Sequence, residues 1–325
     1  MVQFEVFPKI DAHFHAFSDV SVYLDIAKKI SLQYININTD TDIFPLMSEQ
    51  ESISRMYSKK YPEFFSYISS FSMNGWEEQG WMDKVLRQIE TSMQNGALGI
   101  KLWKNIGMEI IKSDGTYLMI DDPFFYPLFQ YLSDNHITVV AHLGEPRNCW
   151  LPIEQMTTER NKAYFSTYPQ YHAFLHPEIP SYEQQIQARD NVLSLFPDLI
   201  FVGAHFGSLE WSVDELALRL DKYPNFMVDV SSRMGHIQLQ AQTAYEKVRD
   251  FFLSYSDRII YGTDAYNNLQ KLQTSLYNDW SFLTTYNVCN SSDILGTFRG
   301  LNLPEDVLLR IYHDNAGKCF LSYPL

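Results

Sequence analysis

Eight short apolar segments, each followed by a stretch of helical character, constrain the fold of this 325-residue chain more than any other feature. Several of them are almost continuously hydrophobic, as are parallel strands that are buried on both faces. Strands that alternate with helices indicate βαβ units, and eight such units predict an α/β fold of the closed (β/α)8 TIM-barrel type. The predicted strands are Pro8–His13, Gln33–Asn38, Phe65–Ser72, Ala97–Trp103, Ile137–His142, Leu199–His205, Asn225–Val230 and Arg258–Gly262.

An open, doubly wound sheet is the second candidate fold, but no glycine-rich phosphate loop follows an early strand. The chain has no internal repeat and no linker, so we expect a single barrel domain over residues 1–325. A long loop insertion is predicted after the fifth strand, at about 144–198. Loops beyond about 15 residues usually have a function, and the many aromatic residues here argue against disorder. A substrate cover, a plug of the barrel end and a dimer contact are the alternatives.

Composition excludes some classes of partner. The net charge is −14 and the isoelectric point is about 5.0, which does not fit the basic patch of a nucleic-acid-binding protein. No run of about 18 apolar residues occurs, so no membrane span is expected. The N-terminus has no secretory signal pattern, and the three cysteines form neither a disulfide framework nor a zinc cluster. These features predict a cytoplasmic protein, unless a leader has been removed.

The motif Asp11-Ala12-His13-Phe14-His15 follows the first apolar segment. Residues i and i+2 of a strand lie on the same face, roughly 7 Å apart along the strand. His13 and His15 would therefore point the same way, and two converging imidazoles suit one metal ion. Alone, this spacing is a weak signal, because a histidine at a strand end is more often a hydrogen-bonded structural residue.

Later polar residues at the ends of predicted strands give this motif its weight. His142 ends the fifth strand, His205 ends the sixth, and Asp264 follows the eighth, while Lys101 lies in the fourth. Catalytic groups of a TIM barrel come from the carboxyl ends of several different strands. We therefore expect these side chains to surround one mouth of the barrel.

Seven motifs occur in order between Ile10 and Phe320, namely DAHFH, GIKLW, VVAHLGEP, FVGAHFGS, VDVSSR, YGTDA and IYHDNAGKCF. With this ordered set the chain resembles the amidohydrolase superfamily. The resemblance is strongest to the branch that contains aminocarboxymuconate semialdehyde decarboxylases and related metal-dependent hydrolases. It spans nearly the whole chain, and the set as a whole is far more specific than any one motif.

The resemblance implies a role for five of these residues. His13 and His15 match the first two metal ligands, and His142 matches the ligand from strand five. Asp264 matches the strand-eight carboxylate, which is a ligand or a base. His205 matches the strand-six histidine, which orients or deprotonates the water or the substrate.

The implied cofactor is one divalent metal ion. Zinc is favoured and manganese is the second candidate, because a His/Asp site accepts several such metals. Bound zinc lowers the pKa of its water to about 7 and can polarise a carbonyl group. In binuclear relatives a strand-four lysine is carbamylated and bridges two metals, so a second metal is expected only if Lys101 carries a carbamate. Otherwise Lys101 contacts a substrate anion or has a structural role.

Two arginines are candidates for substrate binding together with Lys101. Arg147 follows the fifth strand and Arg233 follows the seventh. A guanidinium group suits bidentate binding of a carboxylate. A salt bridge within the same loop is the alternative for either residue.

These features favour a metal-dependent hydrolase of an amide, lactone or ester-like bond in a small molecule, with Asp264 and His205 as catalytic residues. The second hypothesis is non-oxidative decarboxylation of a carboxylated unsaturated or aromatic acid at the same site. The third is a non-catalytic barrel that binds metal. A homodimer is expected from the habit of the family alone.

Overall fold

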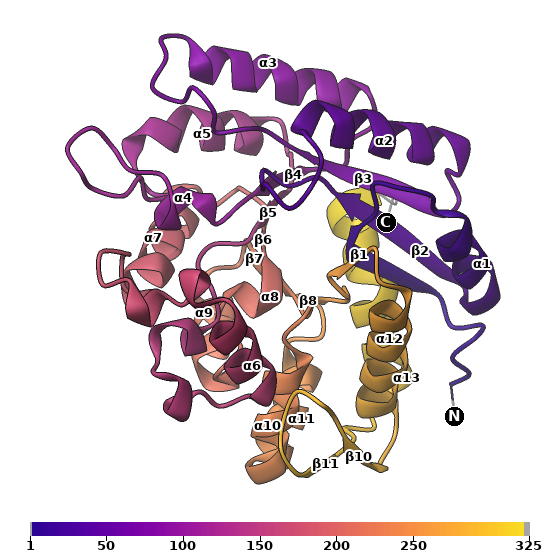
Figure 1. Ribbon diagram of the computed structural model, residues 1–325. Coiled ribbons are helices and arrows are strands. Elements are labelled where there is room, and N and C mark those ends of the chain that lie inside the picture. Colours follow the sequence, from indigo (N-terminus) through magenta and orange to yellow (C-terminus); the bar gives the residue numbers. More distant parts are fainter. Residues whose placement is uncertain (1, 322–325) are drawn as a thin grey trace.

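The computed structural model describes residues 2–321, in which all eight predicted segments contain strands of one parallel sheet (Figure 1). The order is β8-β7-β6-β5-β4-β3-β2-β1-β9, where β9 (Ala265–Tyr266) extends the edge beside β1. The main strands are β1 (Lys9–His15), β2 (Leu32–Ile37), β3 (Phe65–Ser70), β4 (Ile100–Leu102), β5 (Val139–Ala141), β6 (Phe201–Gly203), β7 (Phe226–Asp229) and β8 (Ile259–Ile260).

Two backbone hydrogen bonds join β1 to the chain around the end of β8. The amide of Ala12 donates to the carbonyl of Tyr261 at 3.0 Å, and the amide of Asp264 donates to the carbonyl of His13 at 2.7 Å. Between them lies Gly262, where a Cβ would come within 2.8 Å of the His13 Cβ. Only glycine allows this approach, so it permits β8 to close against β1. The predicted (β/α)8 barrel is confirmed.

Helices cover the outside of the curled sheet (Figure 1). Ser181 and Gln184 form a capping box at the start of α7 (Tyr182–Leu195). The helices are α1 (Ser21–Ile30), α2 (Met47–Lys60), α3 (Trp81–Gln94), α4 (Asn105–Met108), α5 (Tyr126–Asp134), α6 (Glu159–Thr167), α7 (Tyr182–Leu195), α8 (Ala204–Gly207), α9 (Val213–Lys222), α10 (Met234–Thr243), α11 (Tyr245–Ser254), α12 (Leu269–Thr284) and α13 (Glu305–Leu309). A short hairpin, β10 (Val288–Asn290) and β11 (Thr297–Arg299), follows α12.

The connection at 144–198 is not a loop throughout. Its last part is α7, which is the barrel helix between β5 and β6, so the additional segment is 144–181. That segment contains α6 and several 3-10 turns, and it encloses a small core of its own made by Cys149, Met156, Phe165 and Ala173. The prediction of an ordered aromatic segment holds, whereas its predicted end is too late because the capping box at Ser181 starts a regular helix.

The barrel interior is a packed core and not a channel. Small and branched aliphatic side chains from the strands fill it, among them Ile10, Ile35, Val140, Val202 and Ile260. A larger cluster fills the space between strands and helices. The carboxyl ends of the strands are therefore the place where polar side chains can gather. Within residues 2–321, no helix is both long enough and apolar enough to cross a membrane.

Candidate metal centre

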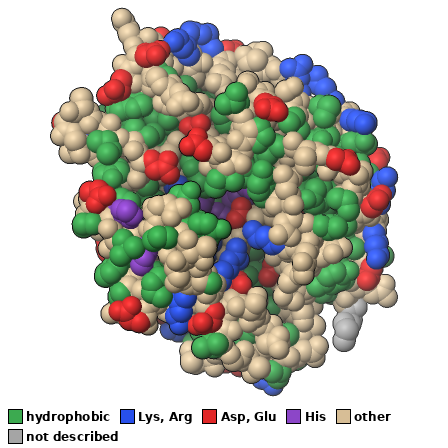
Figure 2. All heavy atoms as spheres, in the orientation of Figure 1, with side chains coloured by type: hydrophobic (Ala, Val, Ile, Leu, Met, Phe, Trp, Pro, Cys, Tyr) green, Lys and Arg blue, Asp and Glu red, His purple; other side chains and the backbone are tan. Residues whose placement is uncertain are grey.

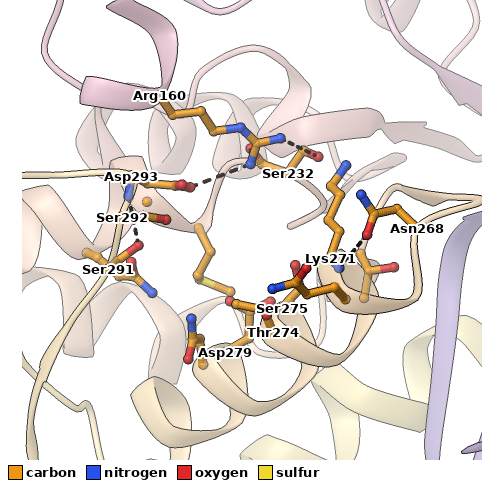
Figure 3. A pocket seen from close by; sticks show the side chains of 16 residues that line it. Arg160, Ser232, Asn268, Lys271, Thr274, Ser275, Asp279, Ser291, Ser292 and Asp293 are labelled. Carbon is orange, nitrogen blue, oxygen red and sulfur yellow. Dashed lines mark hydrogen bonds and ion pairs between the residues drawn. The ribbon is translucent and has the colours of Figure 1, made fainter. Parts of the chain in front are cut away.

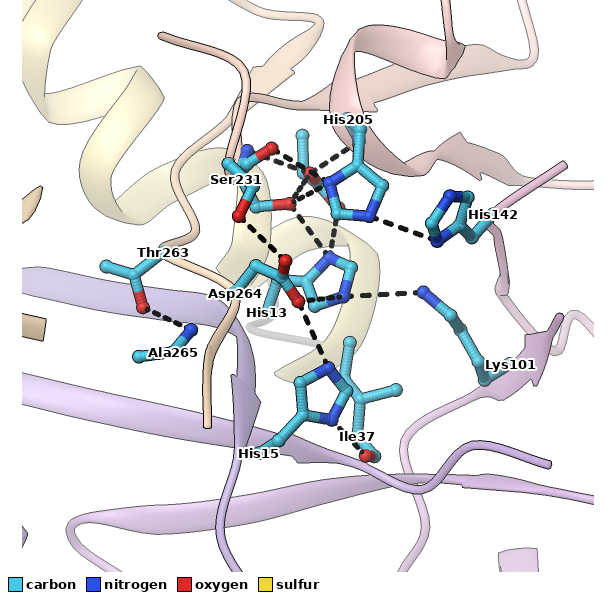
Figure 4. A network of polar contacts seen from close by, with 12 residues as sticks. His13, His15, Ile37, Lys101, His142, His205, Ser231, Thr263, Asp264 and Ala265 are labelled. Carbon is cyan, nitrogen blue, oxygen red and sulfur yellow. Dashed lines mark hydrogen bonds and ion pairs between the residues drawn. The ribbon is translucent and has the colours of Figure 1, made fainter. Parts of the chain in front are cut away.

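The two histidines of β1 turn inward because the strand contains an irregularity. Ile10 and Ala12 pack in the interior cluster, but Phe14, two residues further on, packs in the outer cluster. The pairing of β1 with β2 shifts register between Asp11 and Phe14. Such a bulge changes the face on which the following side chains lie, and bulges are common beside active sites. It places His13 and His15 at the barrel mouth (Figure 4).

His13, His15 and Asp264 come together, as predicted. The Oδ1 atom of Asp264 lies 3.4 Å from His15 Nε2 and 3.7 Å from His13 Nε2. The ligand atoms of these three residues all lie within 4.8 Å of one another. Asp264 has a φ of 55°, in the left-handed region that non-glycine residues rarely adopt. Strain of this kind is typical of functional sites.

The second nitrogen of each β1 histidine is held by an acceptor. His13 Nδ1 lies 2.8 Å from Asp229 Oδ2, and His15 Nδ1 lies 2.8 Å from the carbonyl oxygen of Ile37. A carboxylate and a carbonyl can only accept, so both Nδ1 atoms carry the proton. Both Nε2 lone pairs are then free to bind a metal. Burial lowers the pKa of His15 to about 4, which keeps it neutral at neutral pH.

Asp229 is a residue of this site that the sequence did not indicate. It lies at the end of β7, and its Oδ1 accepts from the amides of His205 and Ser231 at 2.9 and 3.0 Å. Burial would raise its pKa, but the neighbouring His13 holds it below the usual value, so Asp229 is a carboxylate. The motif VDVSSR was the available signal, but an aspartate inside an apolar strand segment gives no indication of its partner.

His142 and His205 form a second pair. His205 Nδ1 donates to the carbonyl of Ser231 at 2.8 Å, so His205 Nε2 accepts from His142 Nδ1 at 3.2 Å. The remaining atom, His142 Nε2, is then a lone-pair nitrogen, and it is buried without a hydrogen-bond partner among the described residues. Burial holds the pKa of both histidines well below the usual value, which keeps them neutral. The predicted fourth ligand thus lies beside His205 and outside the three-residue group.

Lys101 is buried on β4, and its Nζ lies 3.4 Å from His13 Nε2. Burial lowers its pKa to about 8, so that a substantial fraction of the amine is neutral at slightly basic pH. Such an amine is suited either to contact an anion or to react with carbon dioxide.

The two predicted substrate-binding arginines lie in different places, and only one of them is at the barrel mouth. Arg233 lies at the mouth, where Glu145 is 3.7 Å from its Nη2 and its Nε has no partner among the described residues. Glu145 also pairs with Lys104. Arg147 points elsewhere, because its guanidinium stacks over the Trp211 ring at 4.1 Å and lines a different pocket.

A cleft of about 1020 Å³ leads along the mouth from the loops after β2, β3 and β4. Its aromatic lining includes Phe44, whose ring lies 4.8 Å from that of His15, and Trp103, whose ring lies 4.8 Å from that of His142. The additional segment 144–181 contributes Tyr164 and Tyr171 to the same cleft. Figure 2 shows a hollow on this face in which histidine and acidic side chains are visible, with basic side chains along one edge.

These residues fit one divalent metal ion. Two neutral imidazoles and a carboxylate are the donors that catalytic zinc sites use, with a further position left open. The orphaned, buried Nε2 of His142 also indicates that a group from outside the described residues completes its bonding.

A family model described as Amidohydrolase matches residues 73–321. The chain belongs to the amidohydrolase family. The matched region contains Lys101, His142, His205, Asp229 and Asp264, whereas His13 and His15 precede it. No curated protein sequence is significantly similar to the chain.

Solved structures with a similar fold share little sequence with this chain. The 2,6-dihydroxybenzoate decarboxylase from Rhizobium is 14% identical, with a TM-score of 0.57 over 97% of this chain and 99% of that one. A dihydroxybenzoic acid decarboxylase from Polaromonas with bound manganese is 13% identical, with a TM-score of 0.59 over 97% of each chain. A probable 2-pyrone-4,6-dicarboxylic acid hydrolase from Acinetobacter baumannii is 11% identical, with a TM-score of 0.56 over 96% and 98%. At these identities the likeness establishes the fold.

Proposed function

We propose that this amidohydrolase-family enzyme is a metal-dependent hydrolase of an amide, lactone or ester-like bond in a small molecule. The observation that carries the proposal is the convergence of His13 Nε2, His15 Nε2 and Asp264 Oδ1, with both Nδ1 atoms held by acceptors. These three residues would hold one divalent ion, with zinc favoured and manganese second. When bound, such an ion polarises a carbonyl group and makes hydroxide accessible at neutral pH.

His142 is the candidate fourth ligand, and His205 is the candidate catalytic histidine beside it. The bond from His142 Nδ1 to His205 Nε2 orients both rings and leaves the lone pair of His142 Nε2 without a partner among the described residues, as a ligand atom requires. Asp264 and His205 are the residues that would take and return the proton. Ser232 donates to Asp264 Oδ2 at 2.7 Å, which leaves Oδ1 for the metal.

The cleft favours a substrate with a planar or apolar part. Phe44, Trp103, Tyr164 and Tyr171 offer ring faces along the approach to the site. Lys104 and Arg233 lie at the same mouth, but Glu145 pairs with both. A substrate carboxylate could compete with Glu145 for Arg233, whose Nε has no partner among the described residues.

Non-oxidative decarboxylation is the second candidate, and Arg233 is the observation that favours it. In that reaction the bond to the carboxyl carbon breaks, carbon dioxide leaves, and the substrate carbon receives a proton. An arginine at the mouth suits the carboxylate that is lost. Two of the structural neighbours named above are decarboxylases of hydroxylated benzoates.

Metal content and product analysis test the proposal together. We expect about one equivalent of zinc or manganese per chain by elemental analysis, and its loss in His13→Ala. The matched control is His313→Ala, since His313 lies near Lys9 and Leu32 at the opposite end of the barrel. Screening of lactones, esters and N-acyl compounds should give acid release, whereas carbon dioxide from carboxylated phenols would select the second candidate. Failure to bind metal after reconstitution would overturn both.

A further inference from the structure

A second cavity of about 410 Å³ lies beside the candidate metal centre, between residues that follow β7 and β8 and helix α12. Figure 3 shows the side chains that line it. We call it the α12 cavity. Almost all its lining side chains are hydroxyl, amide or charged groups, and the two basic ones come from α6 and α12. The residues used below are Arg160, Ser232, Lys271, Asp279 and Asp293.

The cavity and the metal centre share a wall. Ser232 Oγ donates to Asp264 Oδ2 at 2.7 Å, and Lys271 Nζ donates to the backbone carbonyl of Asp264 at 2.7 Å. Ser232 and Lys271 also line the cavity. A molecule that reacts beside Asp264 therefore has this cavity as an immediate neighbour.

The two basic side chains have unused donors. Arg160 lies 3.5 Å from each of its contacts, which are Asp293 Oδ2, the Ser232 carbonyl and Ser232 Oγ. Strong guanidinium–carboxylate bonds are about 2.7–2.9 Å long. Within residues 2–321, the Lys271 ammonium makes one hydrogen bond, although it has three donors.

The two basic side chains of the cavity are only loosely bound by neighbouring acids. Asp293 lies 3.5 Å from Arg160, and Lys271 contacts the backbone carbonyl of Asp264, whose carboxylate accepts from Ser232. Burial raises the pKa of Asp279 to about 8, so this acid is mostly neutral at pH 7. Among the described residues, Arg160 and Lys271 thus line one cavity with donors that no short carboxylate contact satisfies. Grouped cations with poorly used donors indicate an anionic ligand.

We propose that the α12 cavity binds a carboxylate group of the substrate through Arg160 and Lys271, and that hydroxyl or carbonyl groups of the substrate contact its hydroxyl and amide lining. The substrate is then a polyfunctional acid whose anionic group lies away from the bond that reacts. This inference rests on the proposed function, because it places the reacting bond of the same molecule beside Asp264.

Glutarate is a suitable probe, with glutaramide as its neutral analogue of similar shape. We expect isothermal titration calorimetry to show glutarate binding to the metal-free protein, with no binding of glutaramide. Arg160→Gln and Lys271→Met should each weaken glutarate by about tenfold or more, since each removes a charge-assisted contact. Lys271→Arg keeps the positive charge, so unlike Lys271→Met it should bind glutarate about as tightly as the native protein does. Lys247→Met is the matched control, because Lys247 pairs with Asp214 on the surface.

Equal binding of glutarate and glutaramide, or unchanged glutarate binding in both charge-removing variants, would overturn the proposal. So would tighter binding of inorganic phosphate than of glutarate. Arg160 is 39% exposed, so its variant should stay folded even if Lys271→Met does not. Repeating the titration with metal-loaded protein separates the two proposals. If metal does not bind at all while charge-dependent glutarate binding persists, the proposed function fails and the cavity assignment stands.

Discussion

Replacement of Asp229 by asparagine should weaken metal binding although Asp229 is not a predicted ligand. The Oδ1 atom of Asp229 accepts from the amides of His205 and Ser231 and from the Ser231 hydroxyl. An asparagine will keep its oxygen on this side, because its amide nitrogen there would face two backbone donors. Its NH₂ group must then face His13 Nδ1, where the carboxylate Oδ2 lies in the native protein.

The magnitude follows from the tautomer of His13. Opposite an NH₂ group, Nδ1 becomes the acceptor and the proton moves to Nε2, which then cannot bind metal. Restoring the binding tautomer sets donor against donor in a buried place, at a cost of about 1–3 kcal/mol. Loss of such a supporting carboxylate typically weakens metal affinity by about 10- to 100-fold. We therefore expect a dissociation constant that is raised by about that factor.

Competition with a chromophoric zinc chelator gives the dissociation constant directly. Asp279→Asn is the matched control, since Asp279 is also buried but its closest polar partner is the Tyr261 hydroxyl at 3.3 Å. Circular dichroism should show both variants folded. A zinc affinity of Asp229→Asn within twofold of the native value would refute the tautomer reasoning.

Three further predictions follow from other parts of the structure. His13→Ala should lose metal and activity, and retention of near-native turnover would contradict the assigned ligand. Lys101→Met should retain about one equivalent of metal, whereas a fall from two equivalents would reveal a bridging carbamate. Burial raises the pKa of Glu210 from 4.5 to about 7, so the folded state binds more protons between these values and stability falls as pH rises through this window. Glu210→Gln should therefore become more stable than the native protein as pH rises, by about 3 kcal/mol above pH 7. Urea unfolding of both proteins measures this, and an equal difference in their unfolding free energies at pH 5 and pH 8 would rule the reasoning out.

The fold was predictable because its signals are local. Buried parallel strands need apolar runs, and the least regular segments, at 33–38 and 65–72, still form β2 and β3. The predicted barrel also placed His13, His15 and Asp264 at one mouth, since the carboxyl ends of parallel strands meet there. The end of the additional segment was misjudged only because it was taken to continue past the capping box at Ser181.

Partners that are distant in the sequence were not predictable from it. Asp229 meets His13 across 216 positions, and nothing in the local pattern at β7 indicates this contact. Arg147 follows β5, where a substrate-binding arginine was expected, but its guanidinium stacks on the ring of Trp211. His142 lies at the expected strand end, but its Nδ1 bonds to His205.

The sequence by itself determined the strands, the helices and the polar residues at the strand ends, because these depend on patterns within a few residues. The tertiary structure decided which polar atoms meet and which remain without partners. Closure of β8 against β1 through Gly262 brings Asp264 to the two histidines, and the bulge in β1 turns them inward. The register of neighbouring strands then determines which side-chain atoms come into contact, because a shift of one residue moves a side chain to the opposite face of the sheet.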